Sequence, residues 1–415
     1  MTASPDDLRA VSAGEAKHFF WTQDAPVAKI VAALEAERSD AVRFVGGCVR
    51  DSLLGVKPKD VDLATLLKPE DVVAALKNAR LRAAPTGIEH GTVTGIAGGV
   101  GVEITTLRAD VSTDGRRATV AFTEDWAEDA RRRDFTLNAI YLTTDGSLFD
   151  PVGGIEDLKA GRVRFIGEAR DRIREDYLRI LRFFRFSARF AGAFDAAGLA
   201  ACGAERSGVK KLSAERVGDE ISKILVLPRA PIAIEEMQRA GILAEVWPAE
   251  PSLERFAFLK SLSPSAPAPV GLAALWGEAG EGLDSALRLS KADAARRRAA
   301  LKAAAVIKSG MAAKDARVAL YRAGQTAFRD GALLSAACAG GDGQALARLV
   351  GIADDNAPPV FPFTGKDVIT LGVPAGPRVA ATLKAAEEVW ISEDFPDAGR
   401  AKEILQTEVS KKSVY

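Results

Sequence analysis

The sequence predicts a mixed α/β region followed by a wholly helical remainder, and three observations carry this prediction. Strand-like and helix-like segments are mixed as far as about residue 165. Beyond about residue 168, apolar residues recur at the three- and four-residue spacing of an amphipathic helix. Residues 272–350 are rich in alanine, which has the highest intrinsic helix propensity.

The first part contains one clear helix pattern and several strand candidates. Residues 26–37 have the pattern of an amphipathic helix. Residues 42–45, VRFV, are typical of a short strand and lead directly into a pair of glycines. Residues 102–107 alternate between apolar and polar, as expected of a half-buried strand. Further strand candidates are residues 61–64, 136–142 and 161–166.

The helical part begins with residues 172–189, where apolar residues follow helical spacing. Ser213 is typical of a residue that caps the start of a helix. Residues 263–269 are rich in proline and serine and predict a linker or a long loop. The sequence also predicts a break at residues 357–363 and helices at residues 377–391 and 397–408.

Composition indicates a globular protein of several domains. The 415 residues, of which 47% are hydrophobic and 27% charged, are enough for a sizeable core. Lys plus Arg and Asp plus Glu both number 56, so the net charge does not point to a nucleic-acid partner. No apolar run is long enough to cross a membrane, and the first residues lack the layout of a secretory signal. We therefore expect no membrane partner.

The numbers and positions of cysteine and histidine residues argue against several kinds of metal and disulfide site. Cys48, Cys202 and Cys338 are far apart and form no C-x-x-C pair. This spacing argues against a zinc ribbon or a disulfide framework and predicts a cytoplasmic protein. The two histidines, His18 and His90, are too few for a histidine-metal hydrolase domain.

A glycine pair at the start of a predicted helix is a candidate phosphate site. Gly46 and Gly47 allow the backbone to approach a phosphate closely, and a helix start offers free N–H groups and a positive dipole end. Arg50 adds a positive charge in the first turn. We predict that Gly46, Gly47 and Arg50 bind a nucleotide, although a lone glycine pair would favour a plain helix-opening turn.

Asp60 and Asp62 are candidate metal ligands and catalytic residues. In a strand, residues two apart project from one face, so the two carboxylates would point to the same place. Carboxylate oxygens suit Mg²⁺, and two such ions can activate a hydroxyl and stabilise departing pyrophosphate. Taken alone, such a pair would more often be a solvated turn. Its position shortly after the glycine pair favours nucleotidyl transfer.

A third catalytic carboxylate is often found on a neighbouring strand in sites for nucleotidyl transfer. Glu103 is the candidate, because it lies in the strand predicted for residues 102–107. The alternative is a surface glutamate on an edge strand, and the sequence leaves both open.

The segment RRRDFTLNA, residues 131–139, contributes further candidates. Three arginines in a row usually form a solvated basic face. Because this run lies between an acidic and an apolar segment, we expect at least one of them to point into a cleft. We predict that Arg133 contacts the triphosphate and that Asp134 contacts the ribose or positions the nucleotide. Arg131 is expected at the surface.

Asp176 and Arg179 are candidates for reading the base. They are three residues apart, hence neighbours on one face of a helix. Cytosine and adenine both present an amino donor, which aspartate accepts, beside a ring nitrogen to which arginine donates. Uracil and guanine present the opposite polarity, which would leave buried charges unpaired. The pair therefore predicts selection of CTP and ATP without a template, and Arg182 and Arg185 continue the row. The alternative is a surface ion pair.

With these motifs the sequence resembles the CCA-adding tRNA nucleotidyltransferases, in the bacterial-eukaryotic class of the tRNA nucleotidyltransferase/poly(A) polymerase family. The matching motifs cover a little under half of the chain, and a weaker match lies at residues 363–372. They are FVGGCVRD (44–51), KDVDLAT (59–65), HGTVTG (90–95), TDGRR (113–117), RRRDFTLNAI (131–140), DPVGGIEDL (150–158), REDYLRILRFFRF (174–186) and LSAERV (212–217).

The resemblance implies an α/β head of the polymerase-β-like nucleotidyltransferase type, residues 1–167, followed by all-α parts. These are a base-recognising neck at residues 168–230, a body at 231–350 and a tRNA-binding tail at 351–415. It implies that Asp60 and Asp62 bind Mg²⁺. It also implies that Gly47, Arg50 and Arg133 contact the nucleotide, and that Asp176, Arg179, Arg182 and Arg185 form the base-reading site.

The implied activity is template-independent addition of CCA to the 3′ end of tRNA from CTP and ATP, with release of pyrophosphate. Residues 110–124 align with a flexible loop that helps to switch from C to A addition, which favours complete CCA addition. No DNA partner is expected. The rivals are a poly(A) polymerase, a non-catalytic RNA-binding protein and a nucleotidyltransferase acting on a small molecule or a protein. The D-x-D pair disfavours the non-catalytic protein.

Basic clusters in the helical part are candidates for contact with tRNA phosphates. Each one alone is more typical of ordinary helix solvation, but together they could hold the acceptor arm. They are Lys210–Lys211, Arg296–Arg298 and Lys411–Lys412.

Overall fold

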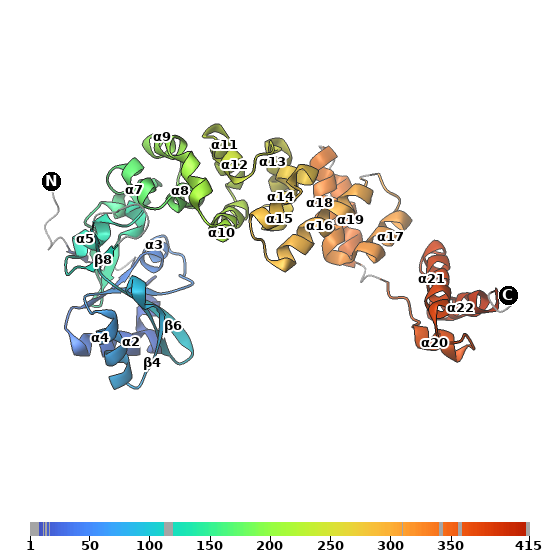
Figure 1. Ribbon diagram of the computed structural model, residues 1–415, viewed down its shortest axis with the longest axis horizontal. Helices are drawn as coiled ribbons and strands as arrows, with labels where there is room; N and C mark the ends of the chain where they lie inside the picture. Colours follow the sequence, from blue (N-terminus) through green and yellow to red (C-terminus); the bar gives the residue numbers. More distant parts are fainter. Residues whose placement is uncertain are drawn as a thin grey trace. The chain divides into compact units, whose positions relative to one another are not determined.

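The computed structural model describes residues 8–10, 12, 15, 17–111, 119–308, 310–339, 343–355 and 359–411 (Figure 1). The chain forms two compact units. The first comprises Met1–Glu220 and Glu235–Val246, and the second comprises Ile221–Ile234 and Trp247–Tyr415.

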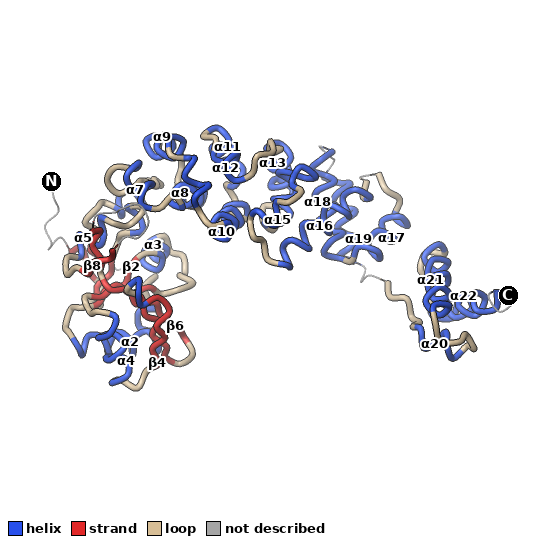
Figure 2. The backbone as a smooth tube through the Cα atoms, viewed as in Figure 1, coloured by secondary structure: helices blue, strands red, loops and turns tan. Residues whose placement is uncertain are grey.

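The strands of the described residues all belong to the first unit, and the second unit is helical where it is described (Figure 2). The strands are β1 (Leu8–Ala10), β2 (Val42–Val45), β3 (Asp62–Thr65), β4 (Arg82–Gly87), β5 (Thr92–Ala97), β6 (Val100–Thr106), β7 (Arg108–Val111), β8 (Thr119–Phe122), β9 (Tyr141–Thr143) and β10 (Ser147–Phe149).

Eight strands form one sheet in the order β1-β10-β9-β2-β3-β6-β5-β4, and β7 pairs with β8. All neighbours in the large sheet are antiparallel except β3 and β6, which run parallel. Side chains in β5 alternate between buried and half-buried, as the period of two requires. The parallel register places Asp62 opposite Glu103, so two candidate carboxylates start from neighbouring strands.

The helices and 3-10 turns (η) of the first unit flank this sheet and extend beyond it (Figure 1). They are η1 (Phe20–Gln23), α2 (Ala25–Glu37), α3 (Gly47–Leu53), α4 (Pro69–Asn78), η2 (Ile88–His90), α5 (Trp126–Arg131), η3 (Thr136–Asn138), α6 (Gly154–Lys159), α7 (Ala169–Glu175), α8 (Leu178–Phe190), α9 (Ala196–Ala204), η4 (Arg206–Lys211) and α12 (Ile242–Val246). Two helices have residues in both units, α10 (Ala214–Leu225) and α11 (Ala230–Arg239).

A cluster of phenylalanine rings packs α8 against the segment that follows α5. The centroid of Phe135 lies 4.9 Å from that of Phe165 and 5.4 Å from that of Phe186. The ring of Phe183 stacks on Phe165 at 5.4 Å. Phe135 and Phe183 are fully buried, so this apolar contact fixes α8 beside the sheet-bearing part of the unit.

The helix predicted for residues 172–189 was wrong in one respect, because α7 and α8 are separate helices. Asp176 between them has extended backbone angles, with φ −152° and ψ 105°. Its Oδ1 accepts a hydrogen bond of 3.0 Å from the backbone N–H of Leu178. Such a local bond from an aspartate competes with helical hydrogen bonding, which explains the break.

Two strand candidates were also wrong. Residues 136–142 begin as η3 and become strand only from Tyr141, and residues 161–166 form no named strand. The backbone makes only an isolated antiparallel bridge here, between Phe135 and Phe165, among the described residues. The predicted start of β3 was early by one residue, so Asp60 lies in the turn before the strand.

The second unit is built from helices joined by short loops (Figure 2). The predicted breaks at residues 263–269 and 357–363 coincide with the ends of helices. The elements are α13 (Leu253–Leu262), α14 (Ala268–Trp276), η5 (Gly277–Gly280), α15 (Leu283–Ala286), α16 (Lys291–Val306), α17 (Ala313–Ala323), α18 (Gln325–Ala339), α19 (Gly343–Asp355), α20 (Gly365–Thr370), α21 (Pro377–Ser392) and α22 (Ala398–Lys411).

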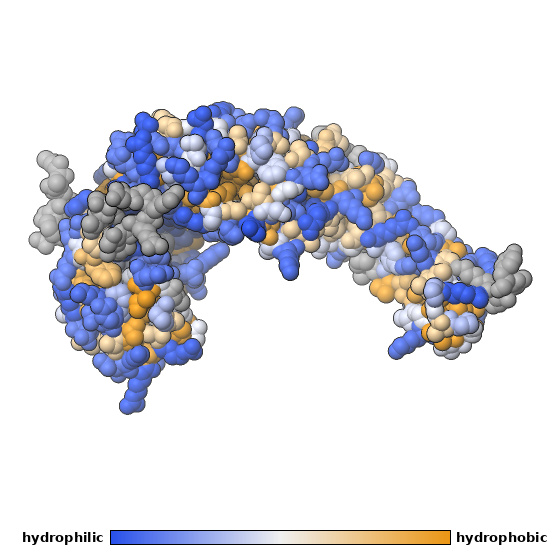
Figure 3. Space-filling model, viewed as in Figure 1, coloured by the Kyte–Doolittle hydropathy of each residue, from blue (hydrophilic) through white to orange (hydrophobic). Residues whose placement is uncertain are grey.

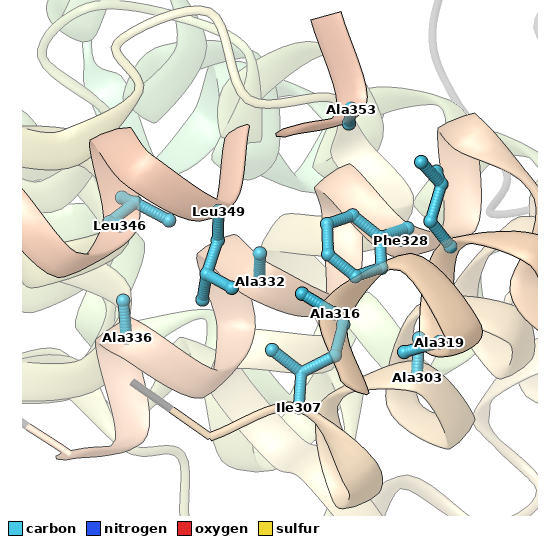
Figure 4. Close-up of a cluster of buried hydrophobic side chains, with 11 residues drawn as sticks. Ala303, Ile307, Ala316, Ala319, Phe328, Ala332, Ala336, Leu346, Leu349 and Ala353 are labelled. Carbon is cyan, nitrogen blue, oxygen red and sulfur yellow. The ribbon is translucent and has the colours of Figure 1, made fainter. Parts of the chain in front are cut away.

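Small side chains allow the helices of the second unit to pack closely (Figure 4). A Cβ built on Gly331 of α18 would lie 2.5 Å from the Cβ of Ala303 of α16, so only glycine fits there. Phe328 is fully buried in the same cluster, beside Leu349 and Ala332. This packing explains why the second unit is rich in alanine.

Hydrophilic side chains predominate on the face drawn in Figure 3, and hydrophobic ones gather in small patches. Among the described residues, no helix combines the length and the apolar character needed to cross a membrane.

Candidate active site

The glycine pair lies where β2 meets α3. Gly46 has φ +75°, a conformation that L side chains rarely adopt, and it precedes the first residue of α3. A Cβ built on Gly46 would lie 4.0 Å from Oδ2 of Asp62 and 4.0 Å from Nη1 of Arg133. The turn therefore brings a carboxylate and a guanidinium, which the sequence predicted as site residues, to the start of α3.

Asp62 is the centre of the acidic group. Its side chain is half-buried at the first residue of β3, whereas Asp60 and Glu103 are exposed. Burial raises the pKa of Asp62 to about 6, with further raising from Glu103 and Asp60, while Arg133 and Arg50 oppose this. The three carboxylates are therefore close enough to repel one another.

These surroundings fit a divalent cation. Crowded carboxylates are an oxygen-rich donor set, and a cation between them would relieve their repulsion. Within the described parts of the chain, no group of three or more His, Cys, Asp or Glu side chains has the arrangement of a metal cage. The chemistry of the donor set thus suits an ion held by one or two carboxylates and completed by substrate oxygens.

Arg133 is fixed beside the acidic group by Asp129 and Tyr141. Its Nη2 donates to Oδ2 of Asp129 at 3.0 Å, and its Nε donates to the hydroxyl of Tyr141 at 3.1 Å. Burial alone would lower the pKa of Arg133, but Tyr141 and Asp129 hold it above its usual value. Arg133 is therefore a permanent positive charge next to Gly46 and Asp62.

Arg50 is placed differently from the other predicted nucleotide contacts. It is 5% exposed, and it donates to Oδ1 of Asp51 and to the side-chain oxygen of Asn138. Its guanidinium also lies 4.4 Å from the ring centroid of Phe190 in α8. These contacts join α3 to α8, and Nη2 of Arg50 also lies beside the glycine turn, 3.7 Å from a Cβ built on Gly47.

Asp134 is buried and forms an ion pair with Arg182, one of the arginines predicted to lie at the base site. Its Oδ2 accepts from Nε of Arg182 at 2.8 Å, and its Oδ1 accepts from the backbone N–H of Phe135 and from Asn138. Burial alone would raise the pKa of Asp134, but Arg182 and Asn138 lower it below the usual value.

Asp176 and Arg179 do not pair with each other. Oδ2 of Asp176 accepts from Nη2 of Arg216 at 2.7 Å. Arg179 donates to Oε2 of Glu175 at 2.5 Å and to the backbone oxygen of Arg132 at 3.1 Å. Both side chains therefore have intramolecular partners at the groups with which they would read a base.

Arg182 and Arg185 share one aromatic platform. Their guanidinium carbons lie 5.1 and 4.3 Å from the ring centroid of Phe186. Arg185 also donates from Nε to Oε2 of Glu220 at 2.6 Å. Stacking and pairing fix both arginines on α8.

Three consecutive residues connect the acidic group with α8. Arg133 lies beside Gly46 and Asp62, whereas Arg132 and Asp134 bind Arg179 and Arg182. The predicted catalytic and base-reading residues are therefore parts of one contiguous network.

Sequence reasoning missed the residue on which this network depends. Asp129 is 1% exposed and accepts from Arg132, Arg133, the hydroxyl of Tyr141 and the backbone N–H of Arg108. The available signal was its spacing, since an acid three and four residues before two arginines can pair with both on a helical turn.

The basic clusters expected to contact RNA are mostly paired with acids. Arg296 pairs with Asp330, and both Arg297 and Arg298 pair with Asp284. Further pairs are Lys210 with Glu245 and Lys411 with Glu408, while Lys412 lies outside the described residues. Their contact with RNA stays a prediction.

Comparison with known proteins places this chain in a family. The family model for the poly A polymerase head domain matches residues 42–164, and the model for a probable RNA and SrmB-binding site of polymerase A matches residues 194–252. The mitochondrial CCA tRNA nucleotidyltransferase 1 of Mus musculus is 35% identical over 373 residues, which cover 87% of this chain and 85% of the mouse protein. This chain belongs to the family of CCA tRNA nucleotidyltransferases.

Other members of the family agree with this placement. The CCA-adding enzyme of Leuconostoc mesenteroides is 40% identical over 202 residues, covering 48% of this chain and 49% of that protein. The crystal structure of the Bacillus stearothermophilus CCA-adding enzyme in complex with CTP is 26% identical, with a TM-score of 0.70 over 94% of this chain and 99% of that chain.

Membership confirms the predicted α/β head and mostly helical remainder, and it makes the chain a nucleotidyltransferase. Nucleotidyltransferases of this polymerase-β type generally use divalent metal ions, which the acidic group around Asp62 fits.

Proposed function

We propose that this chain adds C, C and A to the 3′ end of tRNA, without a template, from CTP and ATP. The observation that carries the proposal is the segment Arg132–Asp134, whose middle residue lies beside Asp62 and whose other two residues bind arginines of α8. It joins a phosphate-transfer site to side chains able to recognise a base. The named activities of its relatives support the same reaction.

Mg²⁺ is the ion that we propose, with Asp60 and Asp62 as its protein ligands. When bound, it would neutralise charge on the reacting phosphate and favour the departure of pyrophosphate. Glu103, opposite Asp62 in the neighbouring strand, is the proposed third carboxylate that accepts the proton of the attacking 3′-hydroxyl.

The nucleotide phosphates are held at the start of α3. The Gly46–Gly47 turn lets the backbone approach them, and Arg133 neutralises their charge from the other side of the turn. Because Asp129 and Tyr141 already hold Arg133, little side-chain order is lost on binding. Arg50, whose Nη2 lies beside Gly47, is the second proposed positive contact to the nucleotide, and it also holds α3 against α8.

The base is selected by Asp176 and Arg179. On binding, Asp176 exchanges Arg216 for the amino group of cytosine or adenine, and Arg179 turns from Glu175 to the ring nitrogen. Uracil and guanine would leave both charged groups unpaired after this exchange. Arg182 and Arg185, fixed on Phe186, border the base site.

The experiment that tests the function uses a tRNA lacking its last three nucleotides. The purified chain is incubated with it and with each nucleoside triphosphate, separately and together, and the product ends are sequenced. We expect two C residues from CTP alone and CCA from CTP with ATP. Long A tails from ATP alone would instead establish the second candidate, a poly(A) polymerase, which the name of the matching head-domain family favours.

We propose that the head, neck, body and tail divide at residues 167, 230 and 350, and that the tail binds tRNA. Residues 112–118 of the loop that favours complete CCA addition lie outside the described residues. The unpaired cysteines are compatible with the cytoplasm, although the names of the vertebrate relatives refer to mitochondria.

A further inference from the structure

An exposed apolar patch lies on the first unit, in segments that the proposed site does not use. Its centre is Phe20, which is 51% exposed, and we call it the Phe20 patch. Its other apolar members are Leu54, 44% exposed, and Val56, 48% exposed. Three exposed lysines from the same two segments accompany them, namely Lys17, Lys57 and Lys59.

Two segments that are distant in the sequence form the patch. A Cβ built on Gly55 would lie 3.4 Å from Cε1 of His18, and Nζ of Lys57 lies 5.7 Å from the ring centroid of Phe20. The segment around Phe20 is anchored by its neighbour Trp21, which is 2% exposed. Nε1 of Trp21 donates to Oγ of Ser52 at 2.8 Å. The exposed ring of Phe20 is therefore displayed from a fixed base.

The lysines of the patch differ from the predicted basic clusters in their lack of ion-pair partners within the described parts of the chain. None of Lys17, Lys57 and Lys59 has an ion-pair partner among the residues that the structure describes. This differs from the predicted basic clusters, whose described members mostly pair with acids. An aromatic ring beside free cations is the arrangement by which proteins bind single-stranded nucleic acid.

The patch lies within a few nucleotides of the proposed catalytic carboxylates. Lys57 and Asp60 are three positions apart in the sequence, and an extended chain spans at most about 3.6 Å per residue, so their Cα atoms are at most about 11 Å apart. Stacked nucleotides rise about 3.4 Å each. About three nucleotides of a strand whose end lies at Asp60 would therefore reach Lys57.

We infer that the Phe20 patch binds the single-stranded 3′ end of the RNA substrate. Phe20 stacks on one of the last bases before the attacking hydroxyl, and the lysines contact the adjoining phosphates. The inference rests on the proposed function and adds to it the place where the primer strand is held. A protein partner is disfavoured, because three apolar side chains are too few for a standard interface.

The test compares two substitutions of Phe20 in the full chain. Phe20→Leu keeps an apolar side chain but removes the stacking face, whereas Phe20→Trp keeps that face. We expect Phe20→Leu to raise the KM for tRNA lacking its last three nucleotides about tenfold, with the KM for CTP unchanged, and Phe20→Trp to retain the wild-type KM. The matched control is Val100→Ala, since Val100 is 45% exposed on the same unit.

A second readout needs no turnover. RNA carrying 2-aminopurine at each of its last four positions in turn should show quenching at one position, lost in Phe20→Leu and kept in Phe20→Trp. Lys57→Gln should reduce the slope of log affinity against log salt by about 0.7. Unchanged KM and unchanged quenching in Phe20→Leu would overturn the inference.

The two readouts also separate this inference from the proposed function. If the wild-type chain quenches the RNA through Phe20 but adds no nucleotide, the patch is supported and the proposed reaction fails. If the wild-type chain adds CCA while Phe20→Leu behaves like it, the reaction stands and the patch does not bind the primer. Melting temperatures of all variants exclude unfolding as the cause.

Discussion

The carboxylate of Asp129 holds the guanidinium of Arg133, with 3.0 Å between Oδ2 and Nη2. Asp129 also binds Arg132. Arg133 lies beside the acidic group, whereas the backbone oxygen of Arg132 accepts a hydrogen bond from Arg179 of α8. One buried carboxylate thus fixes the two arginines that link the acidic group to α8.

Replacing this carboxylate by an amide should damage both stability and activity. Asp129→Asn leaves Arg132 and Arg133 without their counter-charge, and breaking a buried ion pair costs roughly 3 kcal/mol or more. We expect urea unfolding to show this loss and kcat to fall. The matched control is Asp125→Asn, since Asp125 is exposed at the start of the same helix. Equal stability of the two variants would contradict the buried role.

Stability should also fall with acid, and part of this fall belongs to Asp129. Burial alone would raise the pKa of Asp129, but Arg133, Arg132 and Tyr141 lower it well below its usual range. Between the folded and unfolded pKa values the unfolded chain binds the extra proton, so the stabilisation is complete above about pH 5 and is lost as the pH falls further. Urea midpoints from pH 7 to pH 3 should fall more steeply for wild type than for Asp129→Asn.

The proposed metal ligands can be tested separately from the fold. Asp60→Asn and Asp62→Asn should each lower kcat by about a thousandfold or more, because the reacting phosphate loses several kcal/mol of stabilisation. Both proteins should remain folded by circular dichroism. Millimolar Mg²⁺ should raise the melting temperature of the wild type but not of Asp62→Asn. A persisting Mg²⁺ shift in both variants would place the ion elsewhere.

Base selection is tested by comparing the two partners of one ion pair. Asp176→Ala removes the acceptor for the amino group, so the preference for CTP over UTP should fall about tenfold to a hundredfold. Arg216→Ala breaks the same ion pair but keeps the carboxylate, so the preference should survive. Ratios of kcat/KM for the two nucleotides measure this. If both variants lose selectivity alike, the ion pair rather than the carboxylate sets the preference.

The bond between Asp134 and Arg182 should couple the two halves of the site. A double-mutant cycle of Asp134→Asn and Arg182→Gln should give an interaction energy of about 1–3 kcal/mol in urea unfolding. The same cycle on the KM for CTP reports whether the bond also positions the nucleotide. Additive effects in both measurements would show that the pair is not coupled. Arg170, an exposed arginine that pairs with Glu205, supplies the control cycle.

Local patterns predicted the elements well where local forces determine them. The strand expected at residues 42–45 is β2, and the helix expected at residues 26–37 is α2 apart from one residue. In α2 the helical period of the apolar residues matches the buried face, which includes Val27, Ile30 and Leu34. The break at Asp176 was missed, because it depends on one side-chain bond to Leu178 that periodicity does not reveal.

Several predicted site residues lie close together in the structure, but their partners could not be predicted. The sequence motifs named Asp62, Arg133 and Asp134, and the structure gathers them in one network. The partner of Arg50, Asn138, is 88 residues away, so no local pattern could show that this arginine is buried. For Asp129 the spacing before Arg132 and Arg133 was a local signal, but its burial depends on Tyr141 in β9 and Arg108 in β7, which no local pattern reveals.

The parallel pairing of β3 with β6 has a consequence for how the protein is made. The parallel neighbour of β3 is β6, which is encoded after α4, β4 and β5. A nascent chain that ends before Val100 therefore carries Asp60 and Asp62 without the strand that contains Glu103. Closing that long intervening segment is among the slower steps of folding. A ribosome-bound fragment of this length therefore has no assembled centre with which to consume nucleotides.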